Sequence, residues 1–360
     1  MFGAIDTLLI RTPAHVRDAS RVSRIYFATP PRDGSESIPW PRVDYRTYAT
    51  LRDNAPSLEG IAGFWTKTIS SGRGADARSL GAVAVTPSYF TLLGTRPAVG
   101  RFFAANEERD EADHVAVLGY ETWRGQFNGD SAVLGRTIDV VGTPYTIIGV
   151  APKGFTGINI ARVDLWLPLG VASRLLVPGA LEMRNGGYWL EMIAKRRVSA
   201  TDAQLAGEIT KQYRDLHRDS PRYETTFGKT NTVLGPIVEA RGPTKNPDAK
   251  VALWVAVVSL LVLLIASANV ANLLLLRGLT RSREVALRLS LGATRWRVMR
   301  QWLVEGALLA IAGAVCAVAL ARWSASAMRA FLLPDAPHDN VFDLRLLAFT
   351  AVVAIGTGLL

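Results

Sequence analysis

The sequence predicts an α+β extracytoplasmic domain joined to an all-α transmembrane domain. Residues 1–240 mix charged, turn and apolar residues, and residues 241–250 form a short linker, whereas residues 251–360 are dominated by Ala, Leu and Val. Within the last segment, residues 251–276 run without a charged side chain, and a basic cluster follows at residues 277–301. A charge-free run of this length next to a short basic loop is typical of a membrane-spanning helix.

Short strands and amphipathic helices are expected to alternate between residues 20 and 240. Residues 136–150 favour a hairpin that turns at Gly142, Thr143 and Pro144. The strand candidates are short runs that are rich in β-branched and aromatic residues and are bounded by turn residues: 23–28, 81–86, 114–118, 136–150 and 188–196.

Residues 201–217 form the clearest helix. Four apolar side chains recur at helical spacing and define one face: Leu205, Ile209, Tyr213 and Leu216. Thr201 followed by Gln204 is typical of a capping box. A less regular helix is expected near residues 42–53. The long, regular strand–helix alternation of a doubly wound sheet is missing, so we predict an α+β domain.

Three membrane spans are expected after this domain. Residues 251–276 would make about 39 Å of helix, longer than a hydrocarbon core of about 30 Å. Residues 302–323 have Trp302 and Trp323 at their ends, where interfacial aromatic residues are enriched. The last run, 346–360, is too short to span comfortably, so we expect a partial span and a chain truncated at this end.

Arginine distribution sets the expected orientation. Residues 277–301 contain seven Arg and one Glu, which accounts for +6 of the net charge of +10. Short basic loops stay in the cytoplasm, so residues 1–250 should lie outside it. The first residues resemble neither a signal peptide nor a span, so we expect that a transmembrane helix ahead of residue 1 is missing. The alternative, a cytoplasmic N-terminal domain, would place those seven Arg outside.

No catalytic residue, cofactor site or metal site is predicted. The sequence lacks GxxxxGK[ST], HExxH and GxSxG motifs, and its four His are scattered. The acidic stretch 107–113 is interpreted as a solvated loop, with a calcium site as the lesser alternative, and His114 as structural. The basic charge is local, which argues against nucleic acid as a partner and for the lipid bilayer.

Two amides and one carboxylate in the predicted spans are candidates for a role in the membrane. Asn269 and Asn272 occur among small residues, which favours a helix-packing seam over the alternative of a substrate contact. Glu305 lies one turn inside the second span, where a carboxylate is costly, so we expect it to pair with an Arg or to reach the interface.

The loop between the first two spans favours a helix, a break at Gly292 and a second helix. Val285 and Leu289 lie on one side of the first helix, with Arg at its rim. We expect this element to dock on a cytoplasmic partner, through six candidate coupling residues: Arg283, Glu284, Val285, Arg288, Leu289 and Gly292. The alternative is a basic helix lying on anionic lipid.

Several segments resemble the MacB/FtsX-like ABC transporter permeases. NVANLLLLRGLTRSREVALRLSLGATRWRVMRQWLVEGALLA (269–310) is similar to that family's first span after the domain, its coupling loop and the next span. AVTPSYFTLLGTRPAVGRFF (84–103), VAVLGYETWRGQF (115–127), LGRTIDVVGTPYTIIGVAP (134–152) and DLWLP (164–168) are similar to its extracytoplasmic core.

The resemblance implies a core domain of two α+β subdomains and a span ahead of it, and we expect that span to be missing ahead of residue 1. It implies a location in the bacterial inner membrane and a permease subunit that works by mechanotransmission: a separate cytoplasmic ABC ATPase subunit pushes the coupling helices, and the motion reaches the outer domain. A second permease unit or missing second half and a periplasmic adaptor are further implied partners. The alternatives are a non-transporting regulator that signals to a cell-wall enzyme or sensor, and a membrane-anchored enzyme. Family substrates include antibiotics, peptides, toxins and lipoproteins, and no residue selects among them.

Overall fold

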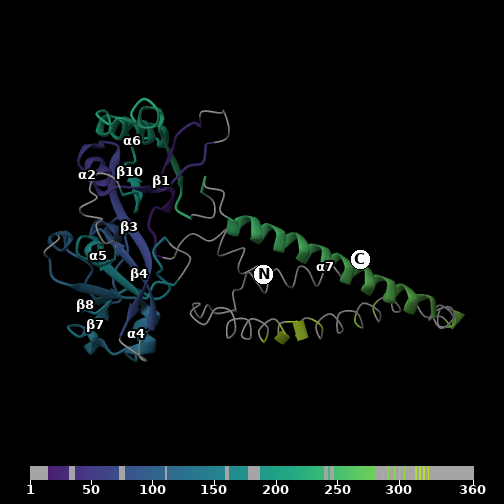
Figure 1. The fold of residues 1–360 in the computed structure, drawn as a ribbon. Coiled ribbons are helices and arrows are strands. Elements are labelled where there is room, and N and C mark those ends of the chain that lie inside the picture. The colour runs from purple at the N-terminus through teal and green to yellow at the C-terminus, as the bar shows by residue number, and fades with distance from the viewer. Residues whose placement is uncertain are drawn as a thin grey trace. The chain divides into compact units, whose positions relative to one another are not determined.

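A computed structural model describes most of the first 280 residues, and it divides into two compact units (Figure 1). One unit comprises residues 7–249, and the other comprises residues 1–6 and 250–360. The described ranges are 15–31, 37–72, 78–109, 112–158, 162–176, 187–238, 242–243 and 247–280, with single residues between 287 and 323.

The larger unit is built on one mixed sheet of eleven strands, in the order β11-β1-β10-β3-β4-β9-β6-β8-β5, with β2 on β10 and β7 on β8. Two of the strand pairs, β4–β9 and β6–β8, are parallel and the others are antiparallel. The strands are β1 (Val22–Ala28), β2 (Arg42–Val43), β3 (Leu58–Ser71), β4 (Arg78–Val85), β5 (Val99–Gly100), β6 (Val115–Leu118), β7 (Thr137–Val140), β8 (Thr143–Val150), β9 (Leu165–Pro168), β10 (Leu190–Arg196) and β11 (Asn231–Pro236).

Short helices accompany this sheet. Figure 1 shows α2 and α6 near β1 and β10, while α4 lies with β7 and β8 at the opposite end of the domain. The α-helices of this unit are α2 (Tyr45–Asn54), α3 (Ser88–Leu93), α4 (Tyr120–Gln126), α5 (Leu169–Leu176) and α6 (Asp202–Leu216); the 3-10 turns are η2 (Ala19–Arg21), η4 (Ala105–Glu108), η5 (Ser131–Val133) and η6 (Phe227–Lys229). The long helix α7 (Pro247–Thr280) belongs almost wholly to the other unit.

Helix α6 confirms the helix expected at residues 201–217. Leu205, Ile209 and Tyr213 are buried, as their spacing predicted, because they face the sheet. The side chain of Thr201 accepts from the Gln204 N–H at 3.2 Å, and the Gln204 side chain accepts from the Thr201 N–H at 2.8 Å. This capping box satisfies two N–H groups that the first turn of a helix leaves without partners.

The sheet is buried on both faces, and successive side chains enter two different apolar clusters. On β4, Ala82 and Ala84 join one cluster, whereas Val83 and Val85 join the other. Helices α2, α4, α5 and α6 contribute to the first cluster, and α3 contributes to the second. Because side chains alternate across a strand, this double coverage makes the central strands apolar on both sides.

Five strand predictions are confirmed, and several strands were not expected. The hairpin of β7 and β8 turns at Val141 and Gly142, one residue before the predicted turn, and both have positive φ. The long strand β3 was not predicted, nor were β2, β5 and β11, and β9 coincides with the DLWLP segment. A mixed α/β domain is therefore confirmed, and its division into two subdomains stays a prediction.

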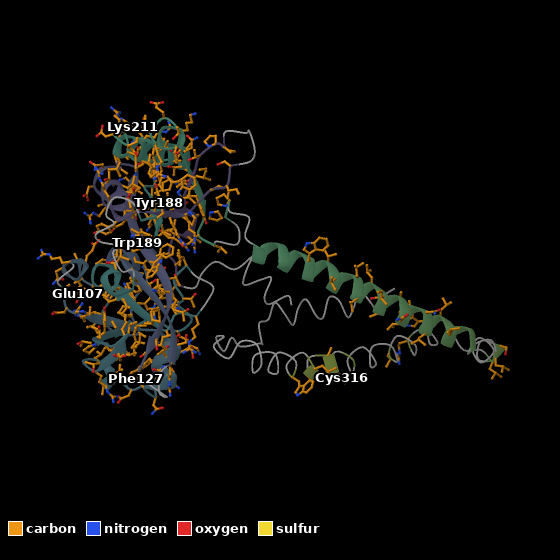
Figure 2. The ribbon with its side chains drawn as sticks, in the orientation of Figure 1. Glu107, Phe127, Tyr188, Trp189, Lys211 and Cys316 are labelled. Atoms are coloured by element: carbon orange, nitrogen blue, oxygen red, sulfur yellow. The ribbon has the colours of Figure 1, made fainter. Side chains whose placement is uncertain are left out.

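The prediction of a solvated acidic loop at residues 107–113 is wrong at its start. Glu107, which is labelled in Figure 2, lies in η4. It is 6% exposed, and its carboxylate accepts two hydrogen bonds from Arg101 and one from the Ala104 N–H. These three donors compensate for the desolvation of the carboxylate, so the Glu107 side chain is stable in its buried position.

Helix α7 begins in the predicted linker and continues through the predicted first span and beyond it. It has 34 residues, and the large apolar side chains described along it are exposed, from Trp254 to Leu276. Within the described part of the chain, no helix meets the length and hydropathy needed to cross a membrane. The span at 251–276 thus stays a prediction, the one at 302–323 is described only at scattered residues, and the one at 346–360 lies outside the described residues.

Candidate functional site

The six candidate coupling residues, 283–285, 288, 289 and 292, lie outside the described residues, as does Glu305. Three of their neighbours are described. The Leu291 N–H donates to the Leu287 carbonyl at 3.1 Å, and the Ser290 hydroxyl donates to the same carbonyl at 2.8 Å. A hydrogen bond over four residues closes one helical turn directly before Gly292.

Asn269 and Asn272 lie on α7, and both are exposed. Residues three apart are neighbours on a helix surface, so the two amides lie on the same side of α7. Each amide can donate and accept hydrogen bonds, which suits a contact with another helix. Their role as a packing seam stays a prediction.

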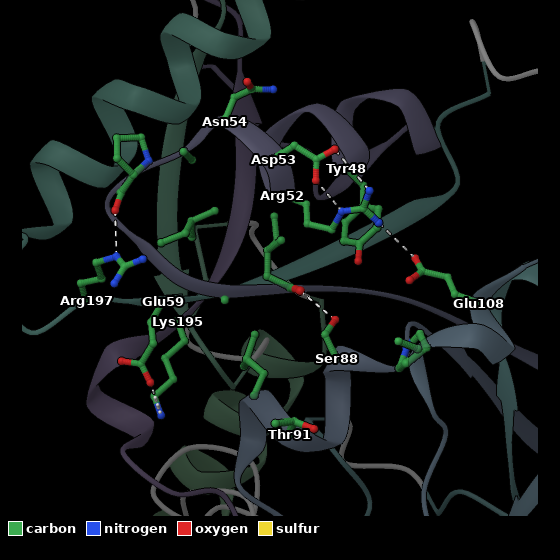
Figure 3. Close-up of a pocket in the computed structure, with 18 of the residues that line it drawn as sticks. Tyr48, Arg52, Asp53, Asn54, Glu59, Ser88, Thr91, Glu108, Lys195 and Arg197 are labelled. Atoms are coloured by element: carbon green, nitrogen blue, oxygen red, sulfur yellow. Dashed lines mark hydrogen bonds and ion pairs between the residues drawn. The ribbon is translucent and has the colours of Figure 1, made fainter.

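The larger unit contains a cavity of about 850 Å³ that the sequence did not predict. Its wall comes from the end of α2, the start of β3, the start of α3, η4 and the end of β10 (Figure 3). Leu58, Ile61, Leu92 and Phe103 are buried side chains in this wall, and charged side chains surround them.

One side of the cavity is organised around Glu108. Its carboxylate accepts from the Tyr45 hydroxyl at 3.3 Å and lies 3.7 Å from the Arg52 guanidinium, which also binds Asp53 at 2.8 Å. Burial raises the pKa of Glu108 above its ordinary value, although Arg52 opposes the shift. Burial together with this nearby carboxylate raises the pKa of Tyr45 to about 12. The ion pair thus joins α2 to η4 across the cavity wall.

The other side is organised around Lys195, at the end of β10. Its ammonium lies 3.0 Å from Glu59 and 3.4 Å from Asp18. Hydrogen bonds from Lys195 and Arg21 lower the pKa of Glu59, and those from Arg21 and Lys195 lower the pKa of Asp18. Both carboxylates therefore stay charged near neutral pH, and the cluster fastens η2 to β3 and β10.

The Ser88 hydroxyl in the wall of the cavity donates to the Ile61 carbonyl at 2.8 Å and lies 2.9 Å from the Thr86 hydroxyl. Among the described residues, no group of three His, Cys, Asp or Glu could hold a metal ion. The wall residues come from four separate stretches of the chain, 48–61, 87–92, 103–108 and 195–197, which is why no local pattern in the sequence indicated the cavity.

Two family models match the chain in tandem. The model of the MacB-like periplasmic core domain matches residues 1–212, and that of the FtsX-like permease C-terminal region matches residues 256–360. The chain belongs to the MacB/FtsX-like ABC transporter permease family. The resemblance seen in the sequence is thereby confirmed.

Two relatives of this chain have names that describe export proteins. The pyoverdine export ATP-binding/permease protein PvdT of Pseudomonas aeruginosa is 30% identical over 236 residues, which cover 64% of this chain and 32% of the relative. The macrolide export ATP-binding/permease protein MacB of Salmonella typhi is 25% identical over 286 residues, which cover 78% of this chain and 40% of the relative. This chain thus spans about a third to two fifths of the length of these relatives.

A solved structure is also similar. The periplasmic region of MacB from Actinobacillus actinomycetemcomitans matches with a TM-score of 0.45 and 14% identity, over 63% of this chain and 93% of that one.

Proposed function

We propose that this chain is the permease part of an ABC exporter of the mechanotransmission type. A cytoplasmic ABC ATPase outside these 360 residues hydrolyses ATP and displaces the loop at 277–301. The extracytoplasmic domain moves in response. The observation that carries the proposal is the tandem order of a MacB-like periplasmic core domain and an FtsX-like permease region.

Three further observations support this assignment. The relatives' names combine export with ATP binding, and the chain itself lacks a GxxxxGK[ST] phosphate-binding loop. The Arg excess at 277–301 favours a cytoplasmic loop. The helical turn at Leu287–Leu291 lies in the segment that we expect to dock on the ATPase.

Leu289→Asp tests this function. In a full-length complex reconstituted in proteoliposomes, with a radiolabelled macrolide and pyoverdine as probes, the wild type should export at least one probe at the expense of ATP. Leu289→Asp should remove an apolar anchor, on the order of 1–2 kcal/mol of docking free energy, and lower the export per ATP hydrolysed without affecting membrane insertion. Gly292→Val should act in the same direction, because Gly best adopts the αL break.

Charge reversal at Arg295 and Arg297 separates coupling from lipid binding. If the loop only rests on anionic lipid, these reversals should impair export more than Leu289→Asp does. Wild-type protein that moves neither probe while its ATPase state alters an extracytoplasmic enzyme would instead favour a non-transporting regulator.

A further inference from the structure

Arg24, on β1, is a buried cation with several acceptors. It is 2% exposed, and its guanidinium lies 5.4 Å from the centre of the Phe64 ring. Its Nε donates to the Ile237 carbonyl at 3.0 Å, one Nη donates to the Ile158 carbonyl at 3.3 Å, and the other donates to Glu191 at 3.2 Å. A buried guanidinium is costly unless such acceptors compensate for its lost hydration.

The acceptors belong to segments that are distant in the sequence and in the sheet. Glu191 lies on β10, next to β1, and Ile158 lies in the connection from β8 to β9, which are strands of the other half of the sheet. The backbone of Ile158 is held a second time, because its N–H donates to the Tyr89 hydroxyl at 3.2 Å. Arg24 therefore links the β8–β9 connection to the strands at the opposite end.

The third acceptor lies where the chain leaves the domain. Ile237 directly follows β11, and Ile237 and Val238 are 5% and 4% exposed within the second apolar cluster. Only residues 239–246 separate this anchored pair from the start of α7 at Pro247. The segment through which α7 is joined to the domain therefore includes the Ile237 carbonyl, which is bonded to Arg24.

We propose that Arg24 is a positioning residue that fastens the exit segment Ile237–Val238 to the sheet and to the β8–β9 connection, so that a displacement of α7 moves the domain. This role rests on the proposed function. Arg suits it because a rigid planar fork holds several acceptors at fixed angles, whereas the single ammonium of Lys cannot reproduce that geometry.

A double replacement distinguishes a tethering role of Arg24 from a contribution to the stability of the domain alone. Arg24→Met alone would leave Glu191 without its buried partner, whereas Arg24→Met with Glu191→Met removes both charges, an exchange that proteins often tolerate. Arg42→Met is the matched control, because Arg42 lies 3.6 Å from the same Glu191 but has a 58% exposed side chain and contacts neither carbonyl in the described structure.

The experiment measures hydrogen exchange in the full-length complex with its ATPase, in nanodiscs, with and without Mg-ATP. In the double variant, the Ile237 and Val238 amides should exchange at least ten-fold faster than in the wild type, at a similar melting temperature. The ATP-dependent change in exchange that we expect in β8 and β9 of the wild type should be lost in the double variant. Arg42→Met should behave as the wild type, and Arg24→Lys should resemble the double variant.

Two outcomes overturn the proposal. Unchanged exchange at Ile237 and Val238 would show that Arg24 does not hold the exit segment, and faster exchange with a retained ATP response would show that the tether transmits nothing. A wild-type complex without any ATP response in the extracytoplasmic domain would refute the proposed mechanotransmission itself, which distinguishes that failure from failure of the Arg24 tether.

Discussion

Replacing Glu107 should destabilise the extracytoplasmic domain measurably at neutral pH. Its carboxylate accepts from the Arg101 guanidinium at 2.7 and 3.0 Å and from the Ala104 N–H at 2.7 Å. Hydrogen bonds to charged groups contribute about 1.5–3 kcal/mol when buried, but the Arg101 side chain is 55% exposed, which brings its share toward the ~1 kcal/mol of surface pairs. Glu107→Gln keeps an acceptor for Ala104, so we expect a loss of about 1–2 kcal/mol, and about 2–3 kcal/mol for Glu107→Ala.

The stability lost in Glu107→Gln should depend on pH in a defined direction. Burial would raise the pKa of Glu107, but the hydrogen bonds from Arg101 and Ala104 overcome this and lower it below the ordinary 4.5. A carboxylate with a lowered folded pKa stabilises the fold fully above its unfolded pKa, and this contribution disappears as the pH falls through the folded pKa. The difference between wild type and Glu107→Gln should therefore be full at pH 7 and should shrink once the pH falls below about 4.

Urea unfolding of residues 7–249, followed by fluorescence at several pH values, measures this difference. Glu224→Gln is the control, because Glu224 is exposed, and it should change the free energy of unfolding by less than about 0.5 kcal/mol. A Glu107→Gln variant as stable as the wild type at pH 7, or one whose deficit stays constant down to pH 3, would refute the role assigned to this carboxylate.

Three further changes test separate parts of the account. Val141→Asn should raise the free energy of unfolding by about 1 kcal/mol in the same urea assay, because Val141 has a φ of 52° that β-branched residues disfavour; a loss of stability would contradict this. Thr201→Ala should cost about 1 kcal/mol by removing the helix cap, and an unchanged unfolding midpoint would show that the cap contributes nothing. A cysteine at Ser131 should react with an impermeant thiol reagent in spheroplasts that express the full-length protein, whereas one at Ser282 should not; the opposite pattern would reverse the orientation.

Local sequence patterns predicted the elements that bury only one face, because their apolar residues recur with the period of the helix or strand. Helix α6 was predictable because its apolar side chains recur at helical spacing behind a capping box, and the β7–β8 hairpin because turn residues interrupt an apolar run. Strand β3 was missed because its first half is buried on both faces and its second half is largely exposed, so no single period covers its 14 residues.

Features that depend on distant residues could not be predicted. The burial of Glu107 requires Arg101 and the Ala104 N–H at a tight turn, which an acidic stretch does not indicate. The acceptors of Arg24 lie 134, 167 and 213 residues away along the chain, and nothing around Arg24 distinguishes it from the other Arg residues. The cavity beside Glu108 likewise exists only once the four stretches of chain that form its wall have packed.

In the proposed mechanism, the loop at 277–301 binds a cytoplasmic ABC ATPase and is displaced when ATP is hydrolysed. A photo-crosslinking amino acid at position 289 of the full-length complex tests it most directly, with position 131 in the extracytoplasmic domain as the control. During ATP turnover, position 289 should crosslink to the ATPase and position 131 should not. If position 289 yields no crosslink to the ATPase while ATP is being hydrolysed, or reacts with lipid alone, the coupling assignment is wrong.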